Sequence, residues 1–331
     1  MKTVFFEVEE WEKPILTEAF PDCIMVHERL DESNVSQFED VEIASCFIYS
    51  KFNAAVLEKL PNLKMIATRS TGYDHIDTDV TKSREICVVN VPEYGSVTVA
   101  EHTFALIINL TRKIYQSVNQ AKQLHFDHLN LRGIDLYGKT LGVIGLGKIG
   151  THVVQIAKGF GMNVIVTNRS HHEDLAKKHG FSYVELDELL AQSDIVTLHL
   201  PYNEHTHHTI NEENIMKMKK GSYLINTARG GLVETEAVVE ALNEGILEGV
   251  GLDVLEGEND MTEEVEVLTH QFRKKDELKT LVLNHMLINH PNVLITPHNA
   301  FNSIEALMRI ENTTIDNIKN YLKGTPSNCI I

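Results

Sequence analysis

Short apolar runs alternate with segments of helical apolar spacing along the first hundred residues. Such runs are typical of buried strands, and we predict strands at residues 4–6, 43–48, 65–68 and 88–90. Between the second and third runs, residues 53–60 have the apolar spacing of a helix, which Pro61 closes. This part of the chain is therefore predicted to form an alternating α/β unit with a parallel sheet.

A second alternating series begins after two helical segments, predicted at residues 100–112 and 116–132. Its strands are predicted at residues 141–144, 164–167, 195–198, 223–226, 249–252 and 293–296. Six strands are enough for a full doubly wound sheet.

The last part of the chain contributes to both units. An amphipathic helix is predicted at residues 303–322, where it can pack back on the first unit and make that domain discontinuous. Residues 259–289 are acidic first and then rich in lysine, which predicts a solvated insertion with one or two helices. A length of 331 residues fits two domains.

Composition excludes several classes of protein. The formal net charge of −17 would repel a polyanion, so we expect no nucleic-acid partner. The four cysteines include no CxxC pair, which predicts neither a disulfide framework nor a zinc site. No signal-type core and no apolar run of about 20 residues is present. We therefore expect a cytoplasmic protein without membrane contact.

The strongest motif is the sequence LGVIGLGKIG at residues 141–150, in which GxGxxG follows a strand and opens a helix. In this context Gly145 permits a tight turn, Gly147 lets the backbone approach a pyrophosphate, and Gly150 lets helix and strand pack closely. The helix N-terminus attracts the phosphate charge. The motif predicts a dinucleotide site, with Lys148 and Ile149 as further contacts.

The next strand ends at Asn168 and Arg169, where NAD-binding proteins usually carry a carboxylate for the ribose hydroxyls. Asn168 does not repel a 2′-phosphate, and Arg169 can pair with one. A solvent-facing arginine at a strand end is the alternative. The pair favours a cofactor site that takes NAD(H) or NADP(H), with a lean towards tolerance of NADP.

Polar residues follow three later strands at the sheet edge where open α/β sheets bind ligands. Arg229 offers a planar fork of N–H donors to a carboxylate. His298, if a carboxylate such as Glu258 supports it, can donate a proton to a carbonyl. Each residue alone would more often be structural, but their convergence favours catalysis. The candidates are Arg229, Asp253, Glu258 and His298, with Pro201, Thr227 and Ala228 as further cofactor contacts.

The histidines of the polar run 203–211 are expected to lie in a solvated loop. His205, His207 and His208 have neither a flanking cysteine nor an HExxH pattern, so no metal site is predicted.

The segments GLGKIG, NTARGGLV, GLDVLEGE and TPHNAF, in this order and spacing, resemble the D-isomer-specific 2-hydroxyacid dehydrogenases. The resemblance covers nearly the whole chain. It implies an α/β fold of two doubly wound parallel-sheet domains: a flavodoxin-like substrate domain from residues 1–100 and 300–331, and a Rossmann cofactor domain from residues 101–299.

The resemblance also implies roles for the candidate residues. Arg229 binds the substrate carboxylate and carbonyl, and His298 is the acid or base. Glu258 supports the protonation of His298, and Asp253 contacts the nicotinamide end.

Three further segments, STGYDHID (70–77), VPEY (91–94) and HNAF (298–301), are similar to the D-lactate dehydrogenases of this family. The likeness implies that the backbone near Thr71 and Gly72 holds the carboxylate, that Tyr94 hydrogen-bonds the substrate, and that Phe301 packs on its side chain. Core packing of Tyr94 and Phe301 is the equal alternative. Pyruvate is the expected substrate, and a homodimer through residues 112–132 of the cofactor domain is implied.

Other members of the family offer alternatives. A glyoxylate or hydroxypyruvate reductase would use the same three residues, and Asn168 with Arg169 mildly favours it. Formate dehydrogenases have Gln in place of Glu258, and phosphite dehydrogenases have Lys in place of Thr71, so both are disfavoured. Related nucleotide-sensing binding modules form an alternative of another class.

Overall fold

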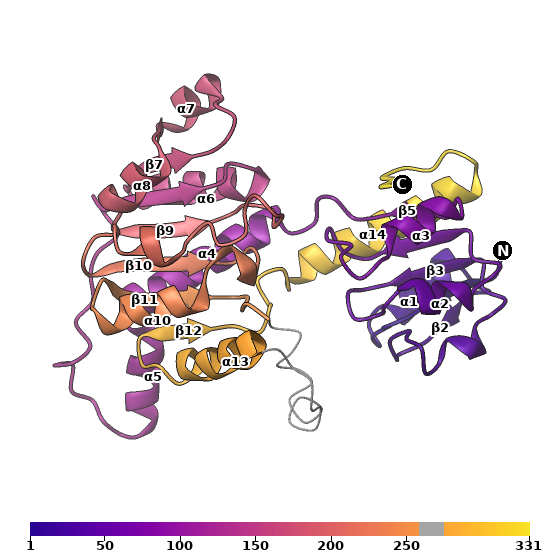
Figure 1. The fold of residues 1–331 in the computed structure, drawn as a ribbon, viewed down its shortest axis with the longest axis horizontal. Coiled ribbons are helices and arrows are strands. Elements are labelled where there is room, and N and C mark those ends of the chain that lie inside the picture. The colour runs from indigo at the N-terminus through magenta and orange to yellow at the C-terminus, as the bar shows by residue number, and fades with distance from the viewer. Residues whose placement is uncertain (258–274) are drawn as a thin grey trace. The chain divides into compact units, whose positions relative to one another are not determined.

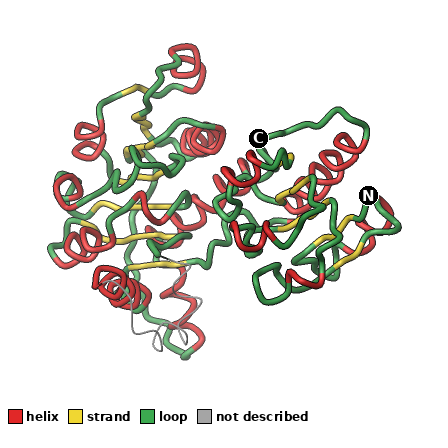
Figure 2. Tube along the Cα trace, turned by 45° about the vertical axis from the view of Figure 1, so that its right-hand side comes forward, coloured by secondary structure: helices red, strands yellow, loops and turns green. Residues whose placement is uncertain are grey.

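The computed structural model describes residues 1–257 and 275–331, without the side chains of residues 275–277. The chain divides into a terminal unit, Met1–Tyr94 with Asn302–Ile331, and a central unit, Gly95–Phe301. Each has its own parallel sheet with helices on both faces (Figures 1 and 2). The predicted fold class of two parallel-sheet α/β domains is therefore confirmed.

The sheet of the terminal unit has the strand order β2-β1-β3-β4-β5. Its strands are β1 (Thr3–Phe5), β2 (Ile24–Met25), β3 (Ile43–Cys46), β4 (Met65–Thr68) and β5 (Cys87–Val89). The helices are α1 (Lys13–Ala19), α2 (Ala54–Glu58), α3 (Thr78–Ser83) and α14 (Ile304–Leu322). Asn53 and Asp77 begin α2 and α3 as side-chain N-caps.

Successive residues of these strands face opposite cores, as the pleat requires. On one face Val4 and Ile66 pack in a core with α2. On the other, Phe5 and Met65 pack with α1 and with Ile315 of α14. The C-terminal helix therefore completes a core whose strands come from the first ninety residues (Figure 1).

The sheet of the central unit has the order β12-β11-β10-β9-β6-β7-β8. Its strands are β6 (Thr140–Ile144), β7 (Asn163–Thr167), β8 (Ser182–Tyr183), β9 (Ile195–Leu198), β10 (Ser222–Asn226), β11 (Leu247–Leu252) and β12 (Val293–Ile295). The chain runs outward from β6 to β8, then returns to β9 on the other side. Ligands of doubly wound sheets bind at such a reversal, beyond the carboxyl ends of the strands.

Helices cover both faces of this sheet. They are α4 (Ser96–Thr111), α5 (Ile114–Lys122), α6 (Lys148–Gly159), α7 (Glu173–His179), α8 (Leu186–Gln192), α9 (Glu212–Ile215), α10 (Thr235–Asn243) and α13 (Lys275–Ile288). One core joins Val143 and Ile225 to α4 and α6. Another joins Ile144 and Leu224 to α8, α9, α10 and α13.

Three predictions about elements need correction. The sheet that was predicted with six strands has a seventh, β8, and the terminal sheet contains the unpredicted β2. Both have two residues, too few to show a period. The helix predicted at residues 116–132 ends at Lys122. Because α5 has no buried residue, no tertiary packing stabilises its extension.

Two further predictions involve the insertion and membranes. Helix α13 lies within the predicted insertion at residues 259–289, and the first part of that insertion lies outside the described residues. Within the described ranges, every helix is too short or too polar to cross a membrane.

Candidate active site and cofactor site

The glycine-rich turn between β6 and α6 leaves no room for side chains at two of its positions. Gly145 has a φ of +96°, and a Cβ there would lie 2.8 Å from the carbonyl oxygen of His199. A Cβ on Gly150 would lie 2.2 Å from the carbonyl oxygen of Gly145. The turn is therefore packed against the end of β9 and against the first turn of α6.

Gly147 differs from these two glycines, because nothing lies within 4 Å of the position its Cβ would take. It is the N-cap of α6, and no side chain caps this helix. The first N–H groups of a helix have no partner within the helix and attract an anion. An open cradle with an uncapped helix N-terminus fits the pyrophosphate of a dinucleotide.

Asn168 connects the end of β7 to this turn. Its Oδ1 accepts a hydrogen bond from the Leu146 N–H at 3.0 Å, and its Nδ2 donates to the Ser170 carbonyl at 2.7 Å. Arg169 beside it is exposed. The end of β7 thus carries two groups. The neutral amide of Asn168 holds two loops together, and Arg169 is an exposed cation.

The remaining predicted cofactor contacts follow β9 and β10 at the same edge. Pro201 accepts a hydrogen bond on its carbonyl from Thr206 Oγ1 at 2.7 Å. The hydroxyls of Thr227 and Thr103 lie 3.0 Å apart, which connects this edge to α4. The N–H of Ala228 donates to Asn226 Oδ1 at 3.0 Å.

Arg229 lies in a tight loop after β10. Asn226 Nδ2 donates to the Arg229 carbonyl at 2.8 Å, and Arg229 Nη1 donates to the Ala228 carbonyl at 2.8 Å. A Cβ on Gly230 would lie 2.1 Å from the Leu255 carbonyl oxygen. The loop is therefore seated on the segment after β11, and the Arg229 side chain remains partly exposed.

Asp253, directly after β11, is 1% exposed and organises the turn that follows β12. Its Oδ1 accepts from Thr296 Oγ1 at 2.5 Å and from the Asn299 N–H at 2.8 Å. Its Oδ2 accepts from the Ala300 N–H at 2.9 Å. Because each donor stabilises the charged form, the buried carboxylate holds residues 296–300 in one conformation.

His298 stands at the centre of this turn and is partly exposed. Its N–H donates to the Asp253 carbonyl at 2.8 Å, and its φ is +50°. A left-handed conformation is unfavourable for a residue with a Cβ and persists only when its surroundings impose it. The hydrogen bonds of Asp253 supply that constraint. Arg229, Asp253 and His298 thus follow the neighbouring strands β10, β11 and β12 at one edge of the sheet.

Of two acidic residues that follow β11, the structure describes only Glu256. Glu258, the predicted partner of His298, lies outside the described residues. Glu256 accepts from Thr235 Oγ1 at 2.8 Å, and its Oε1 lies 2.6 Å from His208 Nε2. His208 lies in the polar run that was expected to form a solvated loop, and its side chain is 28% exposed. Its contact with Glu256, 48 positions away, was not predicted.

In the terminal unit, Thr71 and Gly72 lie in the loop after β4. Thr71 Oγ1 donates to the Val91 carbonyl at 2.7 Å, and Asn90 Nδ2 donates to the Thr71 carbonyl at 2.8 Å. No described residue accepts from the backbone N–H of Thr71 or Gly72. Two such N–H groups on a braced loop can hold a carboxylate.

Tyr94 ends the first segment of the terminal unit, and Phe301 ends the central unit. Both side chains are partly exposed, and Arg309 Nε donates to the Tyr94 carbonyl at 2.7 Å. Thr71, Gly72 and Tyr94 thus belong to the terminal unit, whereas the other described candidates belong to the central unit.

A buried charge cluster precedes the Thr71 loop, and nothing in the sequence pattern indicated it. Arg69 Nε lies 3.5 Å from Glu12 Oε1 and 3.6 Å from Glu311 Oε1. Burial and the hydrogen bond with Glu12 raise the pKa of Glu311 to about 8. Glu311 is then mostly protonated at neutral pH, so one carboxylate balances the one guanidinium.

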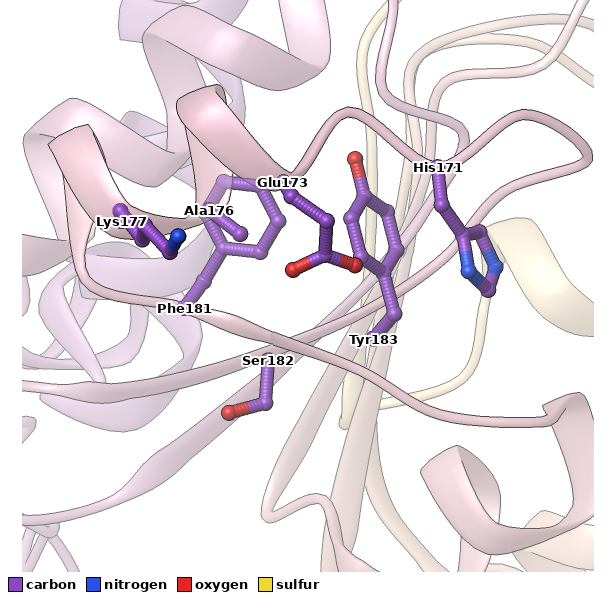
Figure 3. Close-up of a pocket in the computed structure, with 7 residues that line it drawn as sticks. All are labelled: His171, Glu173, Ala176, Lys177, Phe181, Ser182 and Tyr183. Carbon is purple, nitrogen blue, oxygen red and sulfur yellow. The ribbon is translucent and has the colours of Figure 1, made fainter.

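A cavity of about 390 Å³ lies beside α7 and β8 (Figure 3). The rings of His171 and Tyr183 stack at 4.2 Å on its border. It contains none of the predicted site residues, although it adjoins the loop after β7. Among the described side chains, no cluster of three could hold a metal ion.

Comparisons with known proteins place this geometry in context. Residues 104–300 match the family model described as D-isomer specific 2-hydroxyacid dehydrogenase, NAD binding domain. A 2-hydroxyacid dehydrogenase homolog of Zymomonas mobilis is 37% identical over 92% of this chain and 90% of its own length. A glyoxylate reductase of Thermofilum pendens is 35% identical over 91% of this chain and 86% of its own length. The crystal structure of a D-lactate dehydrogenase from Aquifex aeolicus, complexed with NAD and lactic acid, has a TM-score of 0.85 and 37% identity, covering 98% of this chain and 96% of that one.

Proposed function

Because the chain belongs to the D-isomer-specific 2-hydroxyacid dehydrogenases, we propose that it reduces pyruvate to D-lactate with a nicotinamide cofactor. The observation that carries the proposal is the position of Arg229, Asp253 and His298 after three neighbouring strands of the glycine-turn sheet. The likeness to a D-lactate dehydrogenase over nearly the whole chain supports the choice of pyruvate.

Each residue of the central unit has a chemical task in this proposal. The cofactor supplies a hydride to the 2-carbon when bound. The Arg229 guanidinium holds the substrate carboxylate and polarises the adjacent carbonyl. The His298 imidazole gives its proton to the carbonyl oxygen, and Glu258 is the carboxylate partner that the family resemblance implies for it.

Asp253 is expected from the family resemblance at the nicotinamide end. Both of its carboxylate oxygens already accept hydrogen bonds within the turn at residues 296–300. We therefore propose that Asp253 contributes mainly by holding His298 in place.

The terminal unit is proposed to bind the rest of the substrate. The N–H groups of Thr71 and Gly72 also donate to its carboxylate, Tyr94 hydrogen-bonds it, and Phe301 of the central unit packs on its methyl group. The partial exposure of Tyr94 and Phe301 supports contact with substrate over complete burial in a core.

We propose that the enzyme uses NAD(H) and tolerates NADP(H). The NAD-binding family supports the first part. The neutral Asn168 and exposed Arg169 support the second, since neither repels a 2′-phosphate. Lys148, Ile149, Pro201, Thr227 and Ala228 are the further proposed contacts.

A reductase of glyoxylate or hydroxypyruvate is the second candidate. The likeness to a glyoxylate reductase and the Asn168–Arg169 pair favour it. Its substrates differ from pyruvate only at C3, and such a difference is worth about 1–3 kcal/mol in a pocket.

The loss of nicotinamide absorbance distinguishes these candidates. Pyruvate, glyoxylate and hydroxypyruvate are each tested with NADH and with NADPH at matched concentrations. We expect the highest kcat/KM with pyruvate and turnover with both cofactors. Preference for glyoxylate or hydroxypyruvate would select the second candidate, and tight NADH binding without turnover on any of the three would favour a nucleotide-sensing module.

We also propose a homodimer formed through residues 112–132 of the central unit. This region has no helix after Lys122, and it carries side chains as exposed as Leu124 (80%) and Phe126 (79%). Large contiguous apolar groups on a surface are typical of protein interfaces. A second copy of the chain is the occupant we propose.

Light scattering on a size-exclusion column tests the dimer. We expect the mass of two chains for the unaltered protein and of one chain for Phe126→Asp, since a buried unpaired charge opposes association. Leu322→Asp, at another exposed apolar side chain, is the control and should remain dimeric. A monomeric unaltered protein would refute the proposed dimer.

A further inference from the structure

A histidine on α4 lies next to the turn that holds His298. His102 Nε2 lies 3.0 Å from Thr296 Oγ1 and 3.6 Å from Asp253 Oδ1. Its side chain is 19% exposed. His102 therefore connects α4 with the residue that follows β11 and with the turn after β12.

The hydrogen bonds of Thr296 determine how His102 takes part. A threonine hydroxyl has one proton, and here it is donated to Asp253 Oδ1 at 2.5 Å. The same oxygen can then only accept from His102. His102 must therefore carry a proton on Nε2, and the bonds run from His102 through Thr296 to Asp253.

The other hydrogen bonds that Asp253 accepts come from the turn itself. Its carboxylate accepts from the N–H groups of Asn299 and Ala300, and its carbonyl accepts from the N–H of His298. His298 has a φ of +50°, which such a network must impose. If the Asp253 carboxylate changed direction, the backbone of residues 298–300 would move, and the His298 side chain would move with it.

We propose that His102 is a positioning residue: through the Thr296 hydroxyl it fixes the Asp253 carboxylate, and thereby the turn that presents His298 to the substrate. This inference rests on the proposed role of His298. His102 itself acts only through Thr296 and Asp253, so it exchanges no proton with the substrate.

Two substitutions distinguish the contribution of the hydrogen bond from that of the imidazole ring. His102→Leu removes the donor, whereas His102→Gln supplies an amide N–H that can replace the Nε2 donor. We expect kcat to fall about tenfold in His102→Leu, the value of one lost hydrogen bond in the transition state. In His102→Gln most of kcat should return. The dissociation constant of NADH should stay unchanged in both variants.

A double-mutant cycle tests the route. Thr296→Val keeps the shape of threonine and removes its hydroxyl. If His102 acts through that hydroxyl, the double variant His102→Leu/Thr296→Val should be no slower than the slower single variant. Independent effects, which would multiply in the double variant, would refute the route.

Amide hydrogen exchange gives a readout that needs no turnover. Exchange in peptides that cover Asn299 and Ala300 should be faster in His102→Leu than in the unaltered protein, and close to normal in His102→Gln. His179→Leu, on the outer helix α7, is the control and should change neither exchange nor kcat. Equal exchange rates in all variants, or equal losses of kcat in His102→Leu and His102→Gln, would overturn the proposal. A protein that reduces no 2-oxo acid would contradict the proposed function while the exchange data still decide the role of His102.

Discussion

Replacing His298 with alanine should lower kcat for 2-oxo acid reduction by about 10²–10⁴-fold, the usual contribution of a positioned acid or base. The proton that this residue gives to the carbonyl oxygen is needed in the transition state, so KM should change far less than kcat. The dissociation constant of NADH, measured by fluorescence titration, should change little, because the glycine turn at residues 145–150 is intact.

The left-handed backbone of His298 requires a second variant. Alanine is strained at a φ of +50°, whereas asparagine adopts this conformation several-fold more often than most residues. His298→Asn therefore preserves the turn and removes the acid. If its kcat stays near that of the unaltered protein while the melting temperature is unchanged, His298 is not the proton donor.

The second large effect should come from the glycines of the cofactor turn, where two alanine substitutions are expected to act differently. In Gly150→Ala the new methyl group would lie 2.2 Å from the Gly145 carbonyl oxygen, so the turn or α6 must move. Overpacking of this kind costs about 1–3 kcal/mol or more in unfolding free energy. We expect a lower melting temperature by calorimetry together with loss of NADH binding.

In Gly147→Ala the methyl group meets no atom of the protein, and the backbone φ of −81° suits alanine. Stability should therefore stay near normal, while the dissociation constant of NADH should rise about tenfold or more, since the methyl group stands where a pyrophosphate approaches. Gly159→Ala, at an open position of the same helix, should change neither quantity. Tight NADH binding by Gly147→Ala would place the pyrophosphate elsewhere.

The sequence predicted the strands best where most residues of a short run are apolar or β-branched. Residues 195–198, with the sequence IVTL, form β9 with the predicted bounds, because a parallel strand is buried on both faces. Strands β2 and β8 escaped prediction because each has only two residues, placed by pairing with a neighbouring strand. Residues 123–132 lack a helix because helical spacing alone, without a buried face, does not stabilise one.

For the candidate site, the sequence indicated which strand each polar residue follows, and parallel strands bring such residues to one edge. It could not indicate side-chain partners far apart along the chain. Asp253 is bonded to Thr296, and His208 lies against Glu256, across more than forty positions in each case. No local pattern encodes such pairs, since tertiary packing alone decides which side chains meet.

The place of α14 determines when the terminal unit can fold during synthesis. Its core needs Ile315 and Ile318 on the strand face formed by Phe5, Ile43 and Met65. About 200 residues of the central unit are made between Tyr94 and Asn302, which takes roughly 10–40 s at about 5–20 residues per second. Throughout that interval the first ninety residues must keep an uncovered apolar sheet face, whereas the central unit can close its own cores. The nascent chain is therefore most exposed to aggregation and to chaperones at its oldest end.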